Sequence, residues 1–288
     1  MKVLETVAQM RAACDALKRD GKRLGFVPTM GALHAGHLSL VQAARRQCQA
    51  VAASIFVNPT QFGPNEDFSK YPRTFDRDKQ LLEAEKVALL FAPSVEEMYP
   101  VGSKTFVHVE EMSKKLCGKS RPGHFRGVTT VVNKLFNIVE PDLAFFGQKD
   151  AAQCAILRRM VRDLAMSVEI IVCPIIREPD GLALSSRNAY LSPAERKQAT
   201  ILHRALMRVQ SLADKGEHSS EKLIAAARDV FAEQPGVRVD YVEIVDRDTL
   251  DPVPDVSRGA LVAVAAFVGS TRLIDNIVLT AAGSAGHP

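Results

Sequence analysis

Short apolar runs recur along the first two thirds of the chain, and segments with apolar residues every three or four positions separate them. Unbroken apolar runs rich in β-branched residues are typical of strands buried on both faces of a parallel sheet. The predicted strands are 23–29, 50–58, 87–93, 143–147 and 168–174. The predicted helices are 6–19, 37–47, 75–86, 127–138 and 150–164. This alternation predicts an α/β, Rossmann-like parallel sheet with helices on both faces.

The pattern changes after residue 174. Two amphipathic helices come first and three strands follow, at 193–214, 219–233, 238–246, 260–268 and 271–279. Gly269 and Ser270 separate the last two strands, as in a hairpin turn. We therefore expect a Rossmann-like domain at 1–174 and a smaller α+β C-terminal domain at 175–288. The last nine residues are expected to be disordered.

Two segments between the predicted elements are rich in Pro, Gly and charged residues. Residues 58–74 read as a turn-rich loop, and residues 98–126 as irregular apart from a strand at 105–109. Because small and charged residues dominate 60–73 and 112–126, we consider these two stretches candidate lids over a binding site.

Composition excludes some classes of protein. The 288 residues are 47% hydrophobic and 24% charged, which is ordinary for a globular protein. The net charge of +4 suits an anionic small molecule as well as a nucleic acid. The five cysteines show no CxxC spacing, which argues against a disulfide framework and favours a cytoplasmic location. No stretch approaches the ~20 apolar residues that span a bilayer, so we expect no membrane partner.

The segment MGALHAGH, residues 30–37, contains two histidines three positions apart. It joins a predicted strand to a predicted helix, and ligands of parallel sheets bind at such strand ends. A helix N-terminus attracts phosphate, and His34 and His37 could donate hydrogen bonds to it. The pair could also belong to a zinc site, although zinc needs three or four ligands. Ordinary surface histidines and structural caps of the helix are further alternatives, and spacing alone leaves all of these open.

Longer segments add a resemblance. MGALHAGH is similar to the HxGH signature of the nucleotidyltransferase superfamily, which includes class I aminoacyl-tRNA synthetases. A more specific resemblance, to the pantothenate synthetase family, comes from four segments. They are residues 26–41, 56–74, 121–153 and 177–193. The last three of these segments read FVNPTQFGPNEDFSKYPRT, RPGHFRGVTTVVNKLFNIVEPDLAFFGQKDAAQ and REPDGLALSSRNAYLSP. The resemblance continues more loosely to TRLIDNIVL near the end of the chain.

The resemblance implies an enzyme that joins pantoate to β-alanine with ATP. The pantoate carboxylate would attack the α-phosphate of ATP, so that pantoyl-adenylate forms and pyrophosphate leaves. The β-alanine amine would then release AMP. Mg²⁺ is the expected cofactor, held mainly by phosphates and water; Asp76 and Asp78 could support it, but its protein ligands stay unknown. The family also implies a homodimer.

The resemblance also assigns site residues. The catalytic residues are His34, His37 and Lys149. The ATP-binding residues are Met30, Gly31, Ala32, Leu33, His34, Ala35, Gly36, His37, Gly147, Gln148, Lys149, Asp150, Ile176, Leu184, Ser185, Ser186 and Arg187. Gln61 and Gln153 bind pantoate, Gln61 also lies where β-alanine enters, and Asn58 supports that pocket.

Two assignments carry structural expectations. Asp150 should cap helix 150–164 and contact the ribose. LSSR, at 184–187, should be the counterpart of the synthetase KMSKS loop and donate to the β- and γ-phosphates. The segment EMSKKL at 111–116 matches KMSKS more closely by letters. We discount it because it precedes the last strands of the predicted sheet.

Two rival functions remain. The first is another adenylyl- or cytidylyltransferase of the same superfamily, which HxGH alone would permit; the contexts of Gln61 and Gln153 argue against it. The second is a nucleic-acid-binding protein such as a truncated tRNA synthetase. The region after residue 190 has no basic helix or zinc module, which argues against this function. We therefore expect ATP, pantoate and β-alanine as partners and no nucleic acid.

Overall fold

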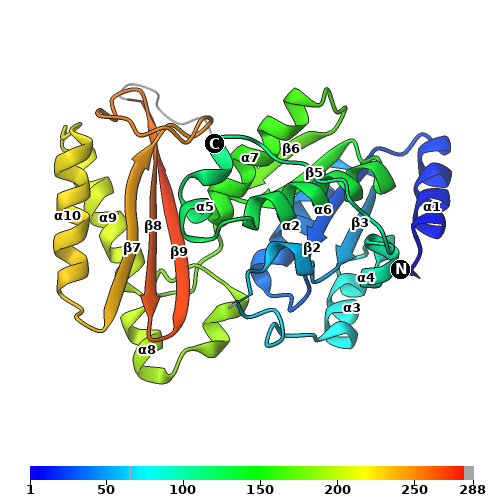
Figure 1. Ribbon diagram of the computed structural model, residues 1–288, viewed down its shortest axis with the longest axis horizontal. Coiled ribbons are helices and arrows are strands. Elements are labelled where there is room, and N and C mark those ends of the chain that lie inside the picture. Colours follow the sequence, from blue (N-terminus) through cyan, green and yellow to red (C-terminus); the bar gives the residue numbers. More distant parts are fainter. Residues whose placement is uncertain (65, 282–288) are drawn as a thin grey trace.

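The computed structural model describes residues 1–64 and 66–281 and contains a parallel sheet of six strands (Figure 1). The strands are β1 (Lys2–Leu4), β2 (Leu24–Thr29), β3 (Ala50–Ile55), β4 (Leu89–Phe91), β5 (Leu143–Gly147) and β6 (Glu169–Cys173). They lie in the order β1-β4-β3-β2-β5-β6, and each neighbouring pair is parallel. The predicted Rossmann-like sheet is confirmed.

Helices cover both faces of this sheet. They are α1 (Val7–Arg19), α2 (Ala35–Gln47), α3 (Phe75–Ala84), α4 (Val95–Met98), α5 (Cys117–Ser120), α6 (His124–Val139) and α7 (Ala151–Asp163). Neighbouring residues of β5 show the two faces, because strand side chains alternate. Phe146 belongs to a core shared with α1, α6 and α7, whereas Phe145 belongs to a core shared with α2 and α3. Burial on both faces explains why the strands are apolar without interruption.

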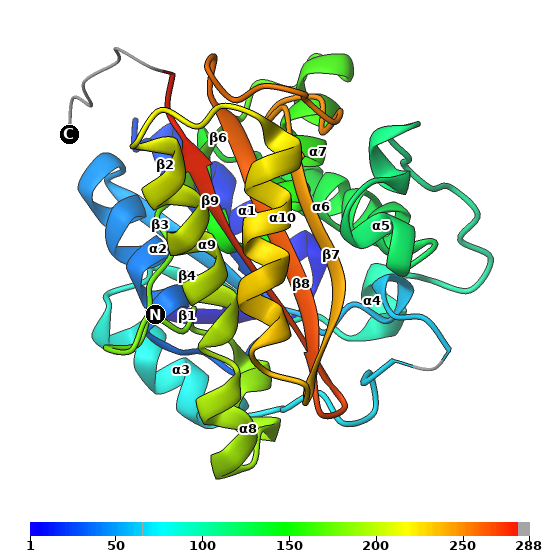
Figure 2. The ribbon, with the colours of Figure 1, turned by 90° about the vertical axis from the view of Figure 1, so that its left-hand side faces the viewer.

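The rest of the chain forms an antiparallel sheet with its own helices. These elements are α8 (Pro193–Gln198), α9 (Ile201–Ala213), α10 (Ser220–Ala232), β7 (Val237–Val245), β8 (Ala260–Val268) and β9 (Thr271–Leu279). Helices α9 and α10 cover one face of the sheet (Figure 2). Tyr241 and Ala263 on its other face share a core with α6 and α7. The predicted hairpin is confirmed, with Gly269 at φ +58° between β8 and β9.

The strand predicted at 105–109 is wrong. Nothing in the described part of the chain pairs with it as a strand, and hydroxyl groups of α6 bind its backbone instead. The Val107 N–H donates to Thr130 Oγ1 over 3.0 Å, and Thr129 Oγ1 donates to the Val107 carbonyl over 2.7 Å. The apolar alternation thus reflects packing on a helix rather than sheet pairing.

Other boundaries also differ from expectation. The predicted helix 193–214 is two helices, α8 and α9, and the Thr200 hydroxyl at the break donates to the Lys197 carbonyl in competition with the helix ladder. The segment 98–126, expected to be irregular, contains α5 and a 3₁₀ turn at Met112–Lys114. The short strand β1 was not predicted. Most of the tail predicted to be disordered lies outside the described residues. In the described part of the chain, no helix combines the length and apolarity needed to cross a membrane.

Candidate active site

The order in which the chain adds strands to the parallel sheet reverses between β2 and β5. From β2 the chain continues to β3 on one side, whereas β5 pairs with the other side of β2, with Phe26 opposite Ala144. In open α/β sheets, ligands bind beyond the carboxyl ends of the strands at such a switch point. The loops that follow β2 and β5 therefore lie side by side, and the charge of Lys149 acts on both His34 and His37.

His34 and His37 together form the start of α2. His34 is the N-cap residue, and its Nδ1 accepts a hydrogen bond from the Gly36 N–H over 3.1 Å. His37 Nδ1 accepts in turn from the His34 N–H over 3.3 Å, which completes a capping box. A Cβ atom at Gly36 would lie 2.9 Å from the His34 ring, so glycine is needed there. The capping role considered from the sequence is confirmed.

Capping fixes which ring nitrogens remain available. Because Nδ1 accepts in both rings, the neutral imidazoles carry their protons on Nε2 and can donate them to a ligand. The ring centroids lie 4.1 Å apart. Burial, and secondarily the charge of Lys149, lowers the pKa of His34 to about 4; burial, His34 and Lys149 lower the pKa of His37 to about 3. Both rings are therefore neutral N–H donors at pH 7.

Lys149 lies on the 3₁₀ turn Gln148–Asp150, which joins β5 to α7. Its ammonium approaches the carboxylate of Asp150 to 3.9 Å, and its side chain is 22% exposed. The expected cap is wrong, because Asp150 occupies the N-cap position of α7 without a side-chain hydrogen bond to the helix. A Cβ atom at Gly147 would meet nothing within 4 Å, so the backbone there is open to a ligand.

The loop between β2 and α2 is held by Asp78 of α3. Its two carboxylate oxygens accept from the Ala32 and Leu33 N–H groups, each over 2.8 Å, and Thr74 Oγ1 donates to the same carboxylate over 3.1 Å. This loop is tightly wound, with φ +84° at Gly31 and +51° at Ala32. Asp78 is fully buried and its oxygens are occupied. It therefore anchors the loop, which replaces the support for Mg²⁺ considered from the sequence.

Gln61 lies directly beside this loop. Its Nε2 contacts Met30 Sδ at 3.1 Å, and its Oε1 accepts from Asn58 Nδ2 over 3.1 Å. Asn58 is 1% exposed and also donates to the Gly127 carbonyl, so α6 fixes its position. Asn58 therefore holds the Gln61 side chain, and its support of a pantoate pocket stays a prediction.

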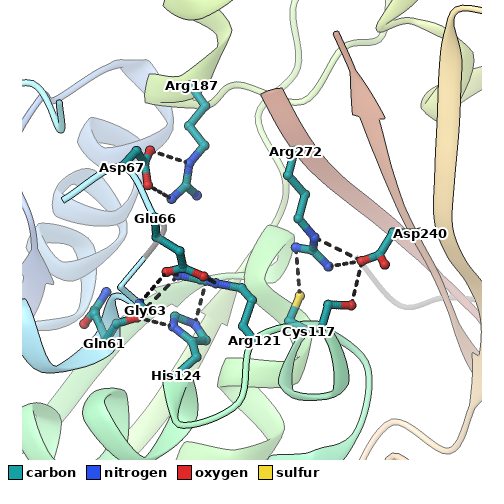
Figure 3. A network of polar contacts seen from close by, with 11 residues as sticks. Gln61, Gly63, Glu66, Asp67, Cys117, Arg121, His124, Arg187, Asp240 and Arg272 are labelled. Atoms are coloured by element: carbon teal, nitrogen blue, oxygen red, sulfur yellow. Dashed lines mark hydrogen bonds and ion pairs between the residues drawn. The ribbon is translucent and has the colours of Figure 1, made fainter. Parts of the chain in front are cut away.

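Two residues without a predicted role hold the Gln61 backbone. His124 Nδ1 lies 2.9 Å and Arg121 Nη2 3.4 Å from the Gln61 carbonyl (Figure 3). Arg121 also donates to His124 Nε2, which leaves the His124 proton on Nδ1 for the carbonyl. The Glu66 carboxylate receives two further bonds of 2.6 Å from Arg121. Burial, with a contribution from Arg121, lowers the pKa of His124 to about 4.

The segment LSSR follows β6, the last strand of the parallel sheet, as expected. The Leu184 N–H donates to the Ile176 carbonyl over 3.0 Å, which places Ile176 beside LSSR. Ser185 Oγ accepts from the Arg187 N–H, and Ser186 Oγ lies 3.5 Å from the Tyr71 hydroxyl. The side chain of Arg187 is bound to Asp67 of the 58–74 loop (Figure 3).

A cavity of about 640 Å³ lies beside Lys149 and LSSR, and its lining does not include His34, His37 or Gln61. Its walls include Lys149 from the 3₁₀ turn, Gln153 from the start of α7, Arg187 from LSSR, and Arg121 and Arg272. The segment EMSKKL lies elsewhere, because Met112 and Lys115 line a different groove. Within the described residues, no group of three or more His, Cys, Asp or Glu could hold a metal ion.

Comparison with known proteins identifies the family. The model of the pantoate–β-alanine ligase family matches residues 2–278. The chain is 61% identical to the pantothenate synthetase of Koribacter versatilis over 288 residues, which are 100% of this chain and 99% of that protein. The chain belongs to the pantoate–β-alanine ligase family.

Solved structures of pantoate–β-alanine ligases share the fold. The pantothenate synthetase of Thermus thermophilus superposes with a TM-score of 0.92 at 50% identity, over 96% of this chain and 99% of that one. The ligase of Francisella tularensis, complexed with β,γ-ATP and β-alanine, gives 0.80 at 35% identity, over 96% and 97%. The resemblance seen in the sequence is confirmed, and the family relationship decides against both rival functions.

Proposed function

We propose that the chain condenses pantoate with β-alanine through pantoyl-adenylate, and that the crevice after β2 and β5 is where the α-phosphate of ATP is attacked. The observation that carries this proposal is the convergence of two Nε2–H donors, the Lys149 ammonium and the N-terminus of α2. These groups suit a phosphate that gains negative charge as it reacts.

The first step needs positioning more than proton transfer. A pantoate carboxylate is already a nucleophile; its oxygen bonds to the α-phosphorus while the bond to the bridging oxygen breaks and pyrophosphate leaves. His34, His37 and Lys149 would neutralise the charge on the phosphate oxygens and hold the two reactants in line. In the second step, the β-alanine nitrogen attacks the acyl carbon, the bond to AMP breaks, and the amine loses a proton to solvent.

The remaining assignments divide ATP and pantoate between the cavity and the neighbouring Gln61. Gln61 and Gln153 would bind pantoate, since amides can both donate to a carboxylate and pair with hydroxyls. Gln61 would also lie next to the entering β-alanine. The turn 147–150 would contact the ribose and α-phosphate, the Ile176 backbone the adenine, and residues 184–187 the β- and γ-phosphates.

Mg²⁺ would enter with ATP. The described residues offer no cluster of ligands for it, so the phosphates and water would supply the coordination. We assign no step to the ion. Its chemical contribution would be to neutralise phosphate charge.

Domain organisation, oligomeric state and cellular location complete the proposal. We propose that residues 1–174 and 175–288 act as two domains, with LSSR on the second. We propose a homodimer, which light scattering of the purified protein would test against a mass of 31.4 kDa per chain. A cytoplasmic location agrees with five cysteines that are all free in the described structure.

The decisive experiment is mass-spectrometric detection of pantoyl-adenylate. The protein is given ATP, Mg²⁺ and pantoate without β-alanine, and exchange of labelled pyrophosphate into ATP is followed in parallel. We expect the adenylate and a pantoate-dependent exchange. When β-alanine is added, the adenylate should be converted to pantothenate and AMP. Exchange that does not require pantoate, or another acyl adenylate in preference, would reject the proposal.

A further inference from the structure

The turn that carries Lys149 is held by a side chain from the antiparallel sheet. Asn276 of β9 donates through Nδ2 to the carbonyls of Gln148 and Lys149, each over 3.0 Å. Its Oδ1 accepts from Gln148 Nε2 over 2.9 Å. Asn276 lies 127 residues beyond Lys149 in the sequence, in the strand of the antiparallel sheet nearest the parallel sheet in Figure 1.

Burial makes this contact well defined. Asn276 is 3% exposed, and all three hydrogen bonds agree on one orientation of its amide. The two carbonyls require a donor, which Nδ2 supplies, and the Gln148 amide requires an acceptor, which Oδ1 supplies. In a buried setting such a satisfied network is rigid, and loss of one donor leaves carbonyl groups without a partner.

The neighbouring residue of β9 holds the other proposed phosphate-binding element. The Asp275 carboxylate accepts two hydrogen bonds from Arg177, of 2.6 and 2.9 Å, and Asp275 is 3% exposed. Arg177 also donates to the Gly181 carbonyl and pairs with Ala183, just before LSSR. Two consecutive residues of one strand thus fix the Lys149 turn and the approach to LSSR relative to each other.

We propose that Asn276 is a positioning residue for Lys149, and this inference rests on the role proposed above for that lysine. The lysine side chain is long and flexible, so the place that its ammonium reaches depends on where the backbone of the turn is held. Asn276, which also lines the cavity, sets that backbone position from the second sheet. A displacement of the ammonium by about 1 Å would cost about 10²-fold in rate.

The test is Asn276→Asp, which keeps the shape and the Oδ1 acceptor but turns an oxygen toward the two carbonyls. We expect the kcat of pantoate-dependent pyrophosphate exchange to fall about 10²-fold, with the KM values of ATP and pantoate close to those of the unchanged protein. Asn276→Ala removes the donors without adding charge and serves if the aspartate variant does not fold. Val262→Ala, in the core of the same sheet, is the stability control, with a lower melting temperature and an unchanged kcat.

Lys149→Ala separates this inference from the proposed function. In that background Asn276→Asp should cause no further loss of kcat, because residues that act through one group are not additive. Equal losses with and without Lys149, a near-normal kcat in Asn276→Asp, or a rise confined to KM would overturn the inference while leaving the proposed function intact. Near-normal exchange in Lys149→Ala alone would instead reject the proposed role of the lysine.

Discussion

The guanidinium of Arg187 donates two hydrogen bonds of 3.0 Å to the carboxylate of Asp67 (Figure 3). Burial alone would raise the pKa of Asp67, but the hydrogen bonds and charge of Arg187 lower it, so the carboxylate is ionised at pH 7. The Asp67 carboxylate is therefore paired with the same guanidinium that we assign to the β- and γ-phosphates of ATP.

Competition for Arg187 predicts opposite effects of two substitutions. Asp67→Asn removes a negative charge that repels the triphosphate, and we expect the KM of ATP to fall. Arg187→Lys keeps the charge but loses the two-pronged geometry, and the KM of ATP should rise about tenfold. Initial rates at saturating pantoate measure both. A rise in both variants would show that Asp67 orients Arg187 for ATP instead of competing with it.

The carboxylate of Asp78 anchors the loop before α2. Replacing one of its oxygens should therefore lower the stability of the protein. Asp78→Asn has the same shape, but its NH₂ group faces a backbone N–H that then has no acceptor. We expect the free energy of unfolding to fall by about 2 kcal/mol, with lower exchange activity because the loop loosens. Urea denaturation measures the first effect. Asp76→Asn is the control, since Asp76 is exposed, and an equal loss there would contradict the anchoring role.

Local patterns predicted the strands of the parallel sheet except the short β1. Continuous apolar runs such as 143–147 can only be buried on both faces, and this predicted β5 with its bounds as observed. The position of a loop after a strand then indicated where His34, His37 and Lys149 would lie, and the family resemblance supplied their roles. The prediction of a strand at 105–109 was wrong because this segment packs on α6 and has no partner strand.

The supporting residues of the site were not predictable in the same way. Asp78 contacts a loop 45 residues away, Asp67 reaches Arg187 over 120 residues, and Asn276 holds a turn from another sheet. Such contacts follow from the tertiary arrangement, which local periodicity does not encode. Asp150 shows the converse error: its place before a helix suggested a cap, but its carboxylate lies near the Lys149 ammonium instead.

The hydrogen bonds around Gln61 predict a selective effect on pantoate. Gln61→Ala removes the amide that Asn58 holds next to the loop, while the groups assigned to ATP stay in place. The KM of pantoate should rise about tenfold, as expected for a lost hydrogen bond, and the KM of ATP should change less. Steady-state kinetics with each substrate varied separately decides the matter. Equal changes in both constants would remove Gln61 from the pantoate pocket.

The histidines have two proposed roles, capping α2 and donating to phosphate. Substitutes that still cap the helix test the second role alone. Asn is a good N-cap residue, and Gln at the third helical position completes a capping box, so His34→Asn and His37→Gln should keep the start of α2. Both remove an Nε2–H donor, and we expect adenylate formation to fall by about 10² or more. His34→Ala should lose similar activity and also about 1 kcal/mol of stability. Normal turnover in the Asn and Gln variants would refute the phosphate role.

The lowered histidine pKa values predict how stability depends on pH. An unfolded histidine takes up a proton near pH 6.5, whereas the folded His37, with a pKa of about 3, stays neutral to much lower pH. Between these values the unfolded state binds more protons, so the free energy of unfolding falls as the pH falls. Acidification from pH 7 to pH 5 should cost about 2 kcal/mol through His37 alone. Urea denaturation at the two pH values should show a smaller difference in His37→Gln than in the unchanged protein. An identical pH dependence in the two proteins would mean that folding does not lower the pKa of His37.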